Sequence, residues 1–415
     1  MINGWEKSNL GHISQVISGS TPKTNIKEYW SNGDINWITP NDLSKLKNKY
    51  INNTERKITA SGLKSCSTIL INQESLVMSS RAPIGYLAIS NNFCTNQGCK
   101  SFVFNDNNST SFFYYQLLSN VAKLKQIGEG TTFAEVSKKQ LESFEILHPK
   151  DIKEQQKIAK ILTSVDESIE ATNKIIVKQK RVKTALMQDL LTRGIDEDGN
   201  IRNEETHEFK DSVLGRIPKE WNLKTIFNIC IVKDGTHQTP RYVSEGMPFY
   251  SVETITKNNF ENVKYVTIEE HLHLTKNFKI ERNDVLMTRI GSIGDCKYID
   301  WDVDASFYVS LALLKFNNPI LAQYFTQYSN HQIFETEISL HSLPFAIPKK
   351  INLGNISDVR IILPSDSNEQ EKITNILSKQ DEAIEQEKQK LHKLQRVKKA
   401  LMQDLLTGKI RVNYE

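Results

Sequence analysis

The residues that could carry out catalysis do not form a familiar catalytic motif. Gly408-Lys409 lacks both the upstream glycine and the following hydroxyl of a phosphate-binding loop. Gly291-Ser292-Ile293-Gly294 lacks the spacing of a nucleotide-binding fingerprint, so a turn between strands explains it better. The sequence has no Gly-x-Ser-x-Gly nucleophile elbow and no Asn/Asp-Pro-Pro-aromatic run that would hold an adenine amino group. We therefore predict a chain without catalytic residues.

The residues that most often bind metals are also scattered. The five cysteines, which form no Cys-x-x-Cys pair, are Cys66, Cys94, Cys99, Cys230 and Cys296. His271 and His273 stand two apart without an obvious third ligand. This usage is typical of a reduced protein, and we predict no metal site.

Residue types that contact nucleic acid are found in several turn-rich stretches. Arginine reads guanine, asparagine or glutamine reads adenine, and lysine or arginine holds phosphates. Arg81 and Arg289 lie in matching loops, one position apart when Ile84-Gly85 is aligned with Ile293-Gly294. The other candidate DNA-binding residues are Lys23, Thr39, Asn41, Thr131, Thr132, Arg241, Ser251, Glu253 and Ser342. For each one, a solvated loop residue or a local cap is the competing explanation.

Length and composition limit the class of protein. A chain of 415 residues with 38% hydrophobic and 25% charged residues indicates two or three globular units. The net charge of +4 permits nucleic-acid binding without favouring it, so any basic surface must be local. No apolar run is long enough to cross a bilayer, and no apolar segment follows the N-terminal charges, so we expect a cytoplasmic protein without membrane contact.

A long helical segment occurs twice, at 154–192 and 369–407. The two copies align without a gap and share roughly half of about 43 positions. Their expected coiled-coil positions are Leu162, Ile169, Ile176, Lys183, Leu190, Leu377, Ile384, Leu391, Lys398 and Leu405. An apolar seam with a 3.5-residue period predicts two helices that wind round each other, and amphipathic helices packed on separate domains are the alternative. The C-terminal ends of both helical segments are apolar and include Met187 and Met402. Each end either packs on the adjacent domain or forms part of a partner-binding surface.

The rest of the chain forms two segments with the same order of features. We predict an α+β domain at 1–150, a helix at 151–193, an exposed linker at 194–215, a second domain at 216–365 and a second helix at 366–415. In the first segment we expect strands at 35–38, 76–78 and 101–104 and one helix at 112–126. Trp221 matches Trp5, and Gly235-Thr236 matches Gly19-Ser20. One fold therefore occurs twice, with a different surface each time.

The closely matched helices and the unlike domains predict a constant frame that carries two different binding surfaces. The short linker requires the second helix to run back along the first, which gives an antiparallel pair with a pseudo-two-fold axis. About 38 residues at 1.5 Å each make a spacer of roughly 57 Å. Two domains held apart by a pseudo-dyad suit a bipartite site on duplex DNA, whose strands have the same symmetry.

These features together resemble the specificity subunit of a Type I restriction–modification system. Both helices end in Arg-Val-Lys-x-Ala-Leu-Met-Gln-Asp-Leu-Leu-Thr, at 181–192 and 396–407, and the joint at 209–221 lies between the two domains. The resemblance covers essentially the whole chain and is strongest in the helices and the joint. It implies an α+β fold with two similar target-recognition domains, joined by two long helices in an antiparallel coiled coil.

The resemblance also implies a function and partners. Each domain would read one half of a bipartite DNA site, and the coiled coil would set the spacer and bind two methyltransferase subunits. Restriction and translocase subunits would complete the complex. S-adenosylmethionine, ATP and magnesium would belong to those partners, with no cofactor on this chain. The alternatives are a non-catalytic tether that joins two protein partners and, less favoured, a self-contained nuclease.

Overall fold

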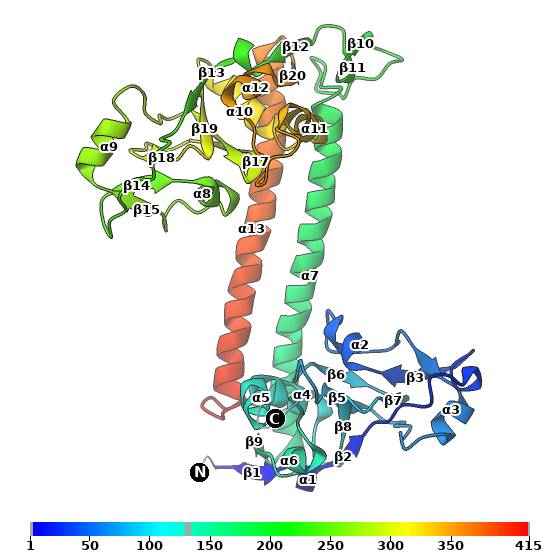
Figure 1. Ribbon diagram of the computed structural model, residues 1–415. Helices are drawn as coiled ribbons and strands as arrows, with labels where there is room; N and C mark the ends of the chain where they lie inside the picture. Colours follow the sequence, from blue (N-terminus) through cyan, green and yellow to red (C-terminus); the bar gives the residue numbers. More distant parts are fainter. Residues whose placement is uncertain (1–2, 129–133, 414–415) are drawn as a thin grey trace. The chain divides into compact units, whose positions relative to one another are not determined.

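The computed structural model describes residues 3–128 and 134–413. Its internal contacts divide the chain into two compact units, Met1–Ile175 with Glu387–Glu415, and Ile176–Gln386. Each unit combines one α+β domain with one end of each of two long helices (Figure 1). The predicted fold class, two mixed domains and two long helices, is confirmed.

Three small sheets build the domain of the first unit. The strands are β1 (Trp5–Asn9), β2 (Ser14–Ser18), β3 (Ile35–Ile38), β4 (Lys57–Ile58), β5 (Ser75–Ser79), β6 (Leu87–Ser90), β7 (Phe93–Thr95), β8 (Cys99–Phe104) and β9 (Glu145–Pro149). The sheets have the orders β2-β8-β5-β6, β4-β3-β7 and β1-β9. All pairs are antiparallel except β3 with β7.

The second unit repeats this arrangement. Its strands are β10 (Phe209–Ser212), β11 (Gly215–Pro218), β12 (Asn222–Thr225), β13 (Cys230–Asp234), β14 (Met247–Tyr250), β15 (Lys264–Val266), β16 (Val285–Ile290), β17 (Ser292–Tyr298), β18 (Ser306–Phe307), β19 (Leu311–Phe316) and β20 (Arg360–Leu363). The orders β13-β19-β16-β17, β15-β14-β18 and β12-β20 match the three sheets of the first unit one for one. The internal repeat that the sequence predicts is therefore present in the strand topology.

Short helices cover these sheets. The first unit has α1 (Leu10–Ile13), η1 (Lys27–Tyr29), α2 (Pro40–Ser44), α3 (Ala60–Lys64), α4 (Thr110–Ser119), α5 (Val121–Gly128) and α6 (Lys138–Glu142). The second unit has η2 (Ile226–Asn228), α8 (Val252–Thr256), α9 (Ile268–Leu274), α10 (Pro319–Tyr328), α11 (Gln332–His341) and α12 (Leu353–Asp358). The long helices are α7 (Ile152–Leu190) and α13 (Ser367–Leu405).

Strand β5 shows why the main sheet of the first unit lies at its centre. All five of its residues are buried. Because neighbouring side chains of a strand point to opposite faces, Leu76 and Met78 join the core that contains Phe112, whereas Val77 joins a second apolar cluster. A sheet covered on both faces holds its strand ends firmly, and the loops that follow those ends take their positions from it.

The helix predicted at 112–126 is two helices. Asn120 lies between α4 and α5 with non-helical backbone angles, and its Nδ2 donates to the carbonyl of Gln116 at 2.8 Å. A side-chain amide that binds the backbone in this way competes with helix continuation. The apolar composition across 112–126 hid this break from the periodicity.

The long helices run antiparallel within each unit. In the second unit, Lys183 contacts Asp381 at 2.6 Å, while the Glu369 carboxylate accepts from the Ile195 amide beyond the end of α7. In the first unit, Lys398 contacts Asp166 at 2.6 Å, and Arg411 reaches Glu154. The lysines at the matching seam positions therefore each have an aspartate on the facing helix. Such a paired polar contact favours one register over others.

The other expected seam positions are mostly apolar and covered. Leu162, Ile176, Leu190, Leu377, Ile384 and Leu405 are buried, whereas Ile169 and Leu391 are half-buried. Met187, Leu190 and Leu191 belong to the core of the second unit, and Leu405 and Leu406 belong to the core of the first. The apolar helix ends therefore pack into the cores of the domains.

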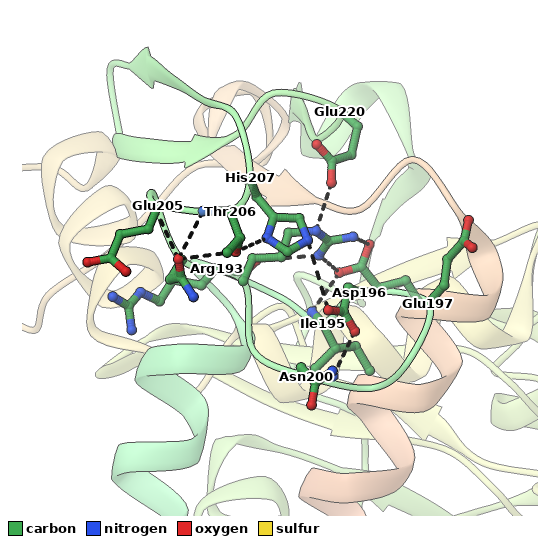
Figure 2. Close-up of polar contacts among 12 residues, drawn as sticks. Arg193, Ile195, Asp196, Glu197, Asn200, Glu205, Thr206, His207 and Glu220 are labelled. Carbon is green, nitrogen blue, oxygen red and sulfur yellow. Dashed lines mark hydrogen bonds and ion pairs between the residues drawn. The ribbon is translucent and has the colours of Figure 1, made fainter.

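The segment 194–215 is only partly the exposed linker that the sequence predicts. Ile195 and Arg202 are buried, and Phe209–Ser212 pairs with Gly215–Pro218 as a hairpin. Figure 2 shows the polar contacts of this segment, in which Asp196 accepts from the Asn200 amide at 2.8 Å and faces His207. The prediction is wrong for Ile195 and Arg202, because the Gly and acidic content describes the exposed residues of the segment and not the two that anchor it.

Candidate nucleic-acid interface

A matching cluster of three side chains fixes the start of each long helix against its domain. In the first unit, the buried Glu154 carboxylate accepts from the Trp5 indole at 3.3 Å and from two nitrogens of Arg411 at 2.6 Å. Two oxygens held by a planar guanidinium leave little freedom of orientation. The cluster therefore ties together the first strand, the helix start and the segment after α13.

The second unit repeats this cluster with different sequence spacing. The Glu369 carboxylate accepts from the Trp221 indole at 3.2 Å and from Arg202, whose Nε also contacts Glu220 at 2.8 Å. Gly194 ends this turn at φ +67°, and a Cβ there would lie 2.2 Å from the Glu369 carboxylate. Only glycine permits both the backbone angle and the close approach. Each domain is therefore attached to the start of its long helix by a cluster of one tryptophan, one glutamate and one arginine.

In the first unit, three chain segments meet at one turn, residues 95–98, which we call the hub turn. The Ser20 amide donates to Thr95 at 3.0 Å, the Asn96 amide donates to Ile38 at 3.0 Å, and the Ser80 amide donates to Gly98 at 2.8 Å. The hub turn therefore brings together the loop with Lys23, the end of β3 and the loop with Arg81. These are three of the loops in which the sequence placed candidate residues.

The second unit has a hub turn at 307–310 with the same bonding pattern. The Thr236 amide donates to Phe307 at 3.2 Å, the Tyr308 amide donates to Tyr250 at 2.9 Å, and the Arg289 amide donates to Ser310 at 2.9 Å. Gly19 and Gly235 make the first of these approaches possible, since a Cβ would lie 2.2 and 2.6 Å from hub-turn carbonyl oxygens. In both units, corresponding loops are therefore held in place by a hub turn.

Arg81 lies at the surface of the first unit beside one carboxylate and one lysine. Its Nε donates to Glu135 at 3.0 Å, and about half of its side chain is exposed. Lys100 is buried beneath it, with its Nζ 3.6 Å from Glu135 and 3.4 Å from the Ser80 hydroxyl. Burial lowers the pKa of Lys100, and the neighbouring Glu135 opposes this shift. An exposed pair of this kind exchanges partners readily, so Arg81 is free to bind an external acceptor.

Arg289 has a different environment from Arg81. Its side chain is 4% exposed, its Nη2 contacts both Asp234 oxygens at 2.9 and 3.0 Å, and its Nη1 donates to the Ile351 carbonyl at 3.3 Å. The hub-turn bonds show that Arg289 occupies the place of Ser80, so the one-position offset in the sequence is real. Arg289 therefore positions the Asp234 loop, and it can reach a base only by breaking this ion pair.

The candidates after β3 and β14 lie at helix starts. Thr39 caps α2, its hydroxyl contacts Asp42 at 2.5 Å, and Asn41 is exposed beside Glu55 at 3.1 Å. Ser251 occupies the N-cap position of α8, where its backbone amide donates to the Thr254 hydroxyl at 3.1 Å. Exposed Glu253 contacts Lys257 along that helix. Thr39 and Ser251 are therefore explained by their positions at helix starts. Asn41 and Glu253 have exposed side chains and remain candidates for DNA contact.

The remaining candidates are loop residues. Lys23 and Arg241 are exposed, as phosphate contacts require, and the carbonyl of Lys23 accepts from the Trp30 indole at 3.1 Å. Ser342 is half-buried and its hydroxyl donates to the Ser339 carbonyl at 2.7 Å. Thr131 and Thr132 lie outside the described residues.

Sequence reasoning missed the hub turns themselves. Gln97 is exposed and contacts the Thr21 hydroxyl, and Tyr308 lies 3.4 Å from the Thr239 hydroxyl. A polar turn, Asn96-Gln97-Gly98, between two apolar strands was the available signal in the first domain. The second domain offered no such signal, because Tyr308 looks like part of a strand in sequence.

Four of the five cysteine thiols lie in environments that disfavour the reactive thiolate. Burial raises the pKa of the Cys94 and Cys296 thiols to about 12, and it raises the pKa of Cys99 and Cys230 as well. Among the described residues, no group of three or more His, Cys, Asp or Glu side chains could hold a metal ion. Within those same residues, no helix is long and apolar enough to cross a membrane.

Comparison with known proteins finds relatives of one kind. The chain is 34% identical over 259 residues to the Type I restriction enzyme MjaIX specificity subunit of Methanocaldococcus jannaschii. That match covers 61% of this chain but only 58% of the relative. The MjaVIII specificity subunit of the same organism is 26% identical over 312 residues, which are 72% of this chain and 70% of that protein.

Solved structures share the fold at low sequence identity. The S subunit of a Type I restriction–modification system from M. genitalium matches with a TM-score of 0.61 and 16% identity, over 97% of this chain and 96% of that one. A chain from a structural study of type I R-M complex assembly matches with a TM-score of 0.55 and 14% identity, over 97% and 98% of the two chains.

One family model describes both halves of the chain. The Type I restriction modification DNA specificity domain matches residues 2–179 and again residues 218–396. Each match takes in one domain and most of the long helix that follows it. The resemblance expected from the repeated helices is therefore confirmed, and the chain belongs to the Type I restriction modification DNA specificity family.

Proposed function

We propose that this chain is the specificity subunit of a Type I restriction–modification complex, in which each domain reads one half of a bipartite site in duplex DNA. The observation that carries this proposal is the repeated hub turn, which displays unlike loops from an identical backbone pattern. In the first unit the loops expose Lys23, Gln97 and Arg81, and in the second they expose Arg241. A shared scaffold with different polar loops suits two readers of different sequences.

The long helices support a second part of the proposal, the docking of two methyltransferase subunits. Four residues at one-face spacing in α7 are exposed and recur unchanged in α13: Lys178, Arg181, Val182 and Ala185 match Lys393, Arg396, Val397 and Ala400. Core packing explains why buried positions repeat, but it does not require exposed ones to repeat. Two identical exposed faces suit two copies of the same partner.

The proposal assigns the chemistry to those partners. The methyltransferase subunits would supply the S-adenosylmethionine site, and restriction and translocase subunits would supply ATP and magnesium. This chain would contribute recognition and the spacing between the two half-sites, set by the helical pair.

The experiment that tests the function is a methylation map of the native host, with and without this gene, together with a pull-down of the chain. We expect a co-purified methyltransferase and the loss of methylation at one split sequence motif. An unchanged methylation pattern with no methyltransferase partner would reject the proposal. A peptide-binding tether would then be favoured, and DNA affinity that falls steeply with salt would argue against such a tether.

Replacing Arg81 with alanine tests the division of labour between the domains. We expect Arg81→Ala to weaken discrimination at one half-site by about 1–3 kcal/mol, because an exposed arginine near the hub turn can bind a base edge. The measurement is the binding of duplexes with substitutions in either half of the mapped site. Lys7→Ala is a matched control, since Lys7 forms an exposed pair with Glu145 within the separate β1-β9 sheet. Equal losses at both half-sites would contradict the two-reader model.

A further inference from the structure

One loop of the second unit exposes two large apolar side chains. Phe345 is 95% exposed and Ile347 is 99% exposed, and they stand two residues apart in residues 343–350, which we call the tip loop. A soluble protein gains nothing from leaving such groups in water, and fully exposed apolar side chains in close proximity indicate a binding surface. Within the described residues, both side chains are left almost uncovered.

The tip loop is held firmly at its base. The Leu343 amide donates to the Lys350 carbonyl at 2.8 Å, which closes the loop. The Gly291 amide donates to the Lys349 carbonyl at 2.8 Å, and the Ile351 amide donates to the Arg289 carbonyl at 3.0 Å. These bonds attach the loop to the turn between β16 and β17, which the hub turn also contacts through Arg289. A fixed base lets the apolar pair be presented in a defined place.

The charge around the apolar pair favours a polyanion. The segment 340–350 contains Lys349 and Lys350 and has no Asp or Glu. Lys349 is exposed and lies directly after Ile347-Pro348. Two lysines that directly follow an apolar tip suit contact with the phosphate backbone beside a base step.

We propose that Phe345 and Ile347 form a wedge that enters duplex DNA at the half-site read by the second domain and partly unstacks one base step. The inference rests on the proposed function, because it takes duplex DNA as the ligand. Apolar side chains inserted between base steps kink the duplex and allow closer contact with protein. The cost of unstacking differs between steps, so the wedge adds sequence preference at a position without hydrogen-bonded readout.

The test uses the complex of this chain with its methyltransferase and duplexes that carry the mapped target. 2-Aminopurine, which brightens when unstacked, replaces single bases across the second half-site, avoiding the methylated base because that base is itself turned out of the helix. We expect fluorescence to rise severalfold at one step with the wild-type complex. With Phe345→Ala the rise should disappear and binding should weaken at least tenfold, whereas Phe345→Trp should retain the signal.

Phe227→Ala is the matched control, since Phe227 is a 74% exposed phenylalanine of the same unit that belongs to η2 and not to the tip loop. It should behave as wild type. Removing a side chain that is almost fully exposed should leave the thermal melting temperature unchanged, which separates loss of contact from loss of folding.

The outcomes distinguish the wedge from the proposed function. If the wild-type complex does not discriminate the second half-site, the proposed function fails and the wedge fails with it. If the wild type discriminates and Phe345→Ala binds and brightens equally well, the wedge alone is overturned. Loss of the methyltransferase from the Phe345→Ala complex would also overturn it, by assigning the tip loop to a protein partner.

Discussion

Replacing Glu369 with alanine should lower the free energy of unfolding of the second unit by about 3 kcal/mol, because it removes the buried carboxylate that pairs with the Arg202 guanidinium and leaves only the exposed Glu220 beside it. Arg202 has 9% of its side chain exposed and Glu369 has 7%. The Trp221 indole and the Ile195 amide lose their acceptor in the same step. Hydrogen exchange followed by mass spectrometry gives the readout, with faster exchange in residues 194–221 and 353–386.

The chain supplies its own matched control for this prediction. Glu154→Ala removes the equivalent carboxylate from Trp5 and Arg411, so it should speed exchange in the first unit and spare the second. In the double variant Arg202→Met with Glu369→Leu, part of the loss should be recovered, since no buried charge remains unpaired. The Trp221 indole and the Ile195 amide still lack an acceptor in this variant. If each single variant changed hydrogen exchange equally in both units, the idea that each cluster stabilises only its own domain would be wrong.

Replacing Arg289 with alanine should lower the stability of the second unit by about 3 kcal/mol, at the lower end for a broken buried pair. The lower value is expected because Asp234 keeps 22% of its side chain exposed and retains His237 at 2.7 Å. Discrimination at the second half-site should fall as well, because Asp234 ends β13 and begins the loop that meets the hub turn. Denaturant unfolding and binding to substituted duplexes measure the two effects.

A second variant separates positioning from direct base contact. Asp234→Ala combined with Arg289→Ala removes both charges and should restore part of the stability, because replacing both partners is less costly than removing one. If Arg289→Ala leaves stability unchanged and still abolishes discrimination, Arg289 contacts a base directly. That was the expectation from its sequence position alone.

The long helices were predictable because their signal is periodic and repeated. Seam residues such as Leu162 and Leu377 recur at a fixed spacing. The lysines at matching seam positions indicated the register of the two helices from the sequence alone. The duplicated domain fold was also predictable, from turn signals such as those at Gly19 and Gly235 that recur in the same order. Both features depend on residues close to one another in the chain.

The parts that could not be predicted depend on contacts between distant residues. Trp5 and Glu154 are 149 positions apart, and no spacing rule links them to Arg411. Arg81 and Arg289 looked alike in sequence, yet one is exposed beside Glu135 and the other is buried against Asp234. The difference follows from a shift of one position at the end of a strand, which turns a side chain from one face of the sheet to the other.

The cluster of Trp5, Glu154 and Arg411 has a consequence for how the protein is made. Arg411 leaves the ribosome 257 residues after Glu154, roughly 10–50 s later at about 5–20 residues per second. Leu405 and Leu406, which complete the core of the first unit, appear almost as late. The domain that is synthesised first is therefore the last to be completed. A ribosome that stops before Leu405 would release a chain whose first-made domain is unfinished, and that domain would be open to chaperones and proteases.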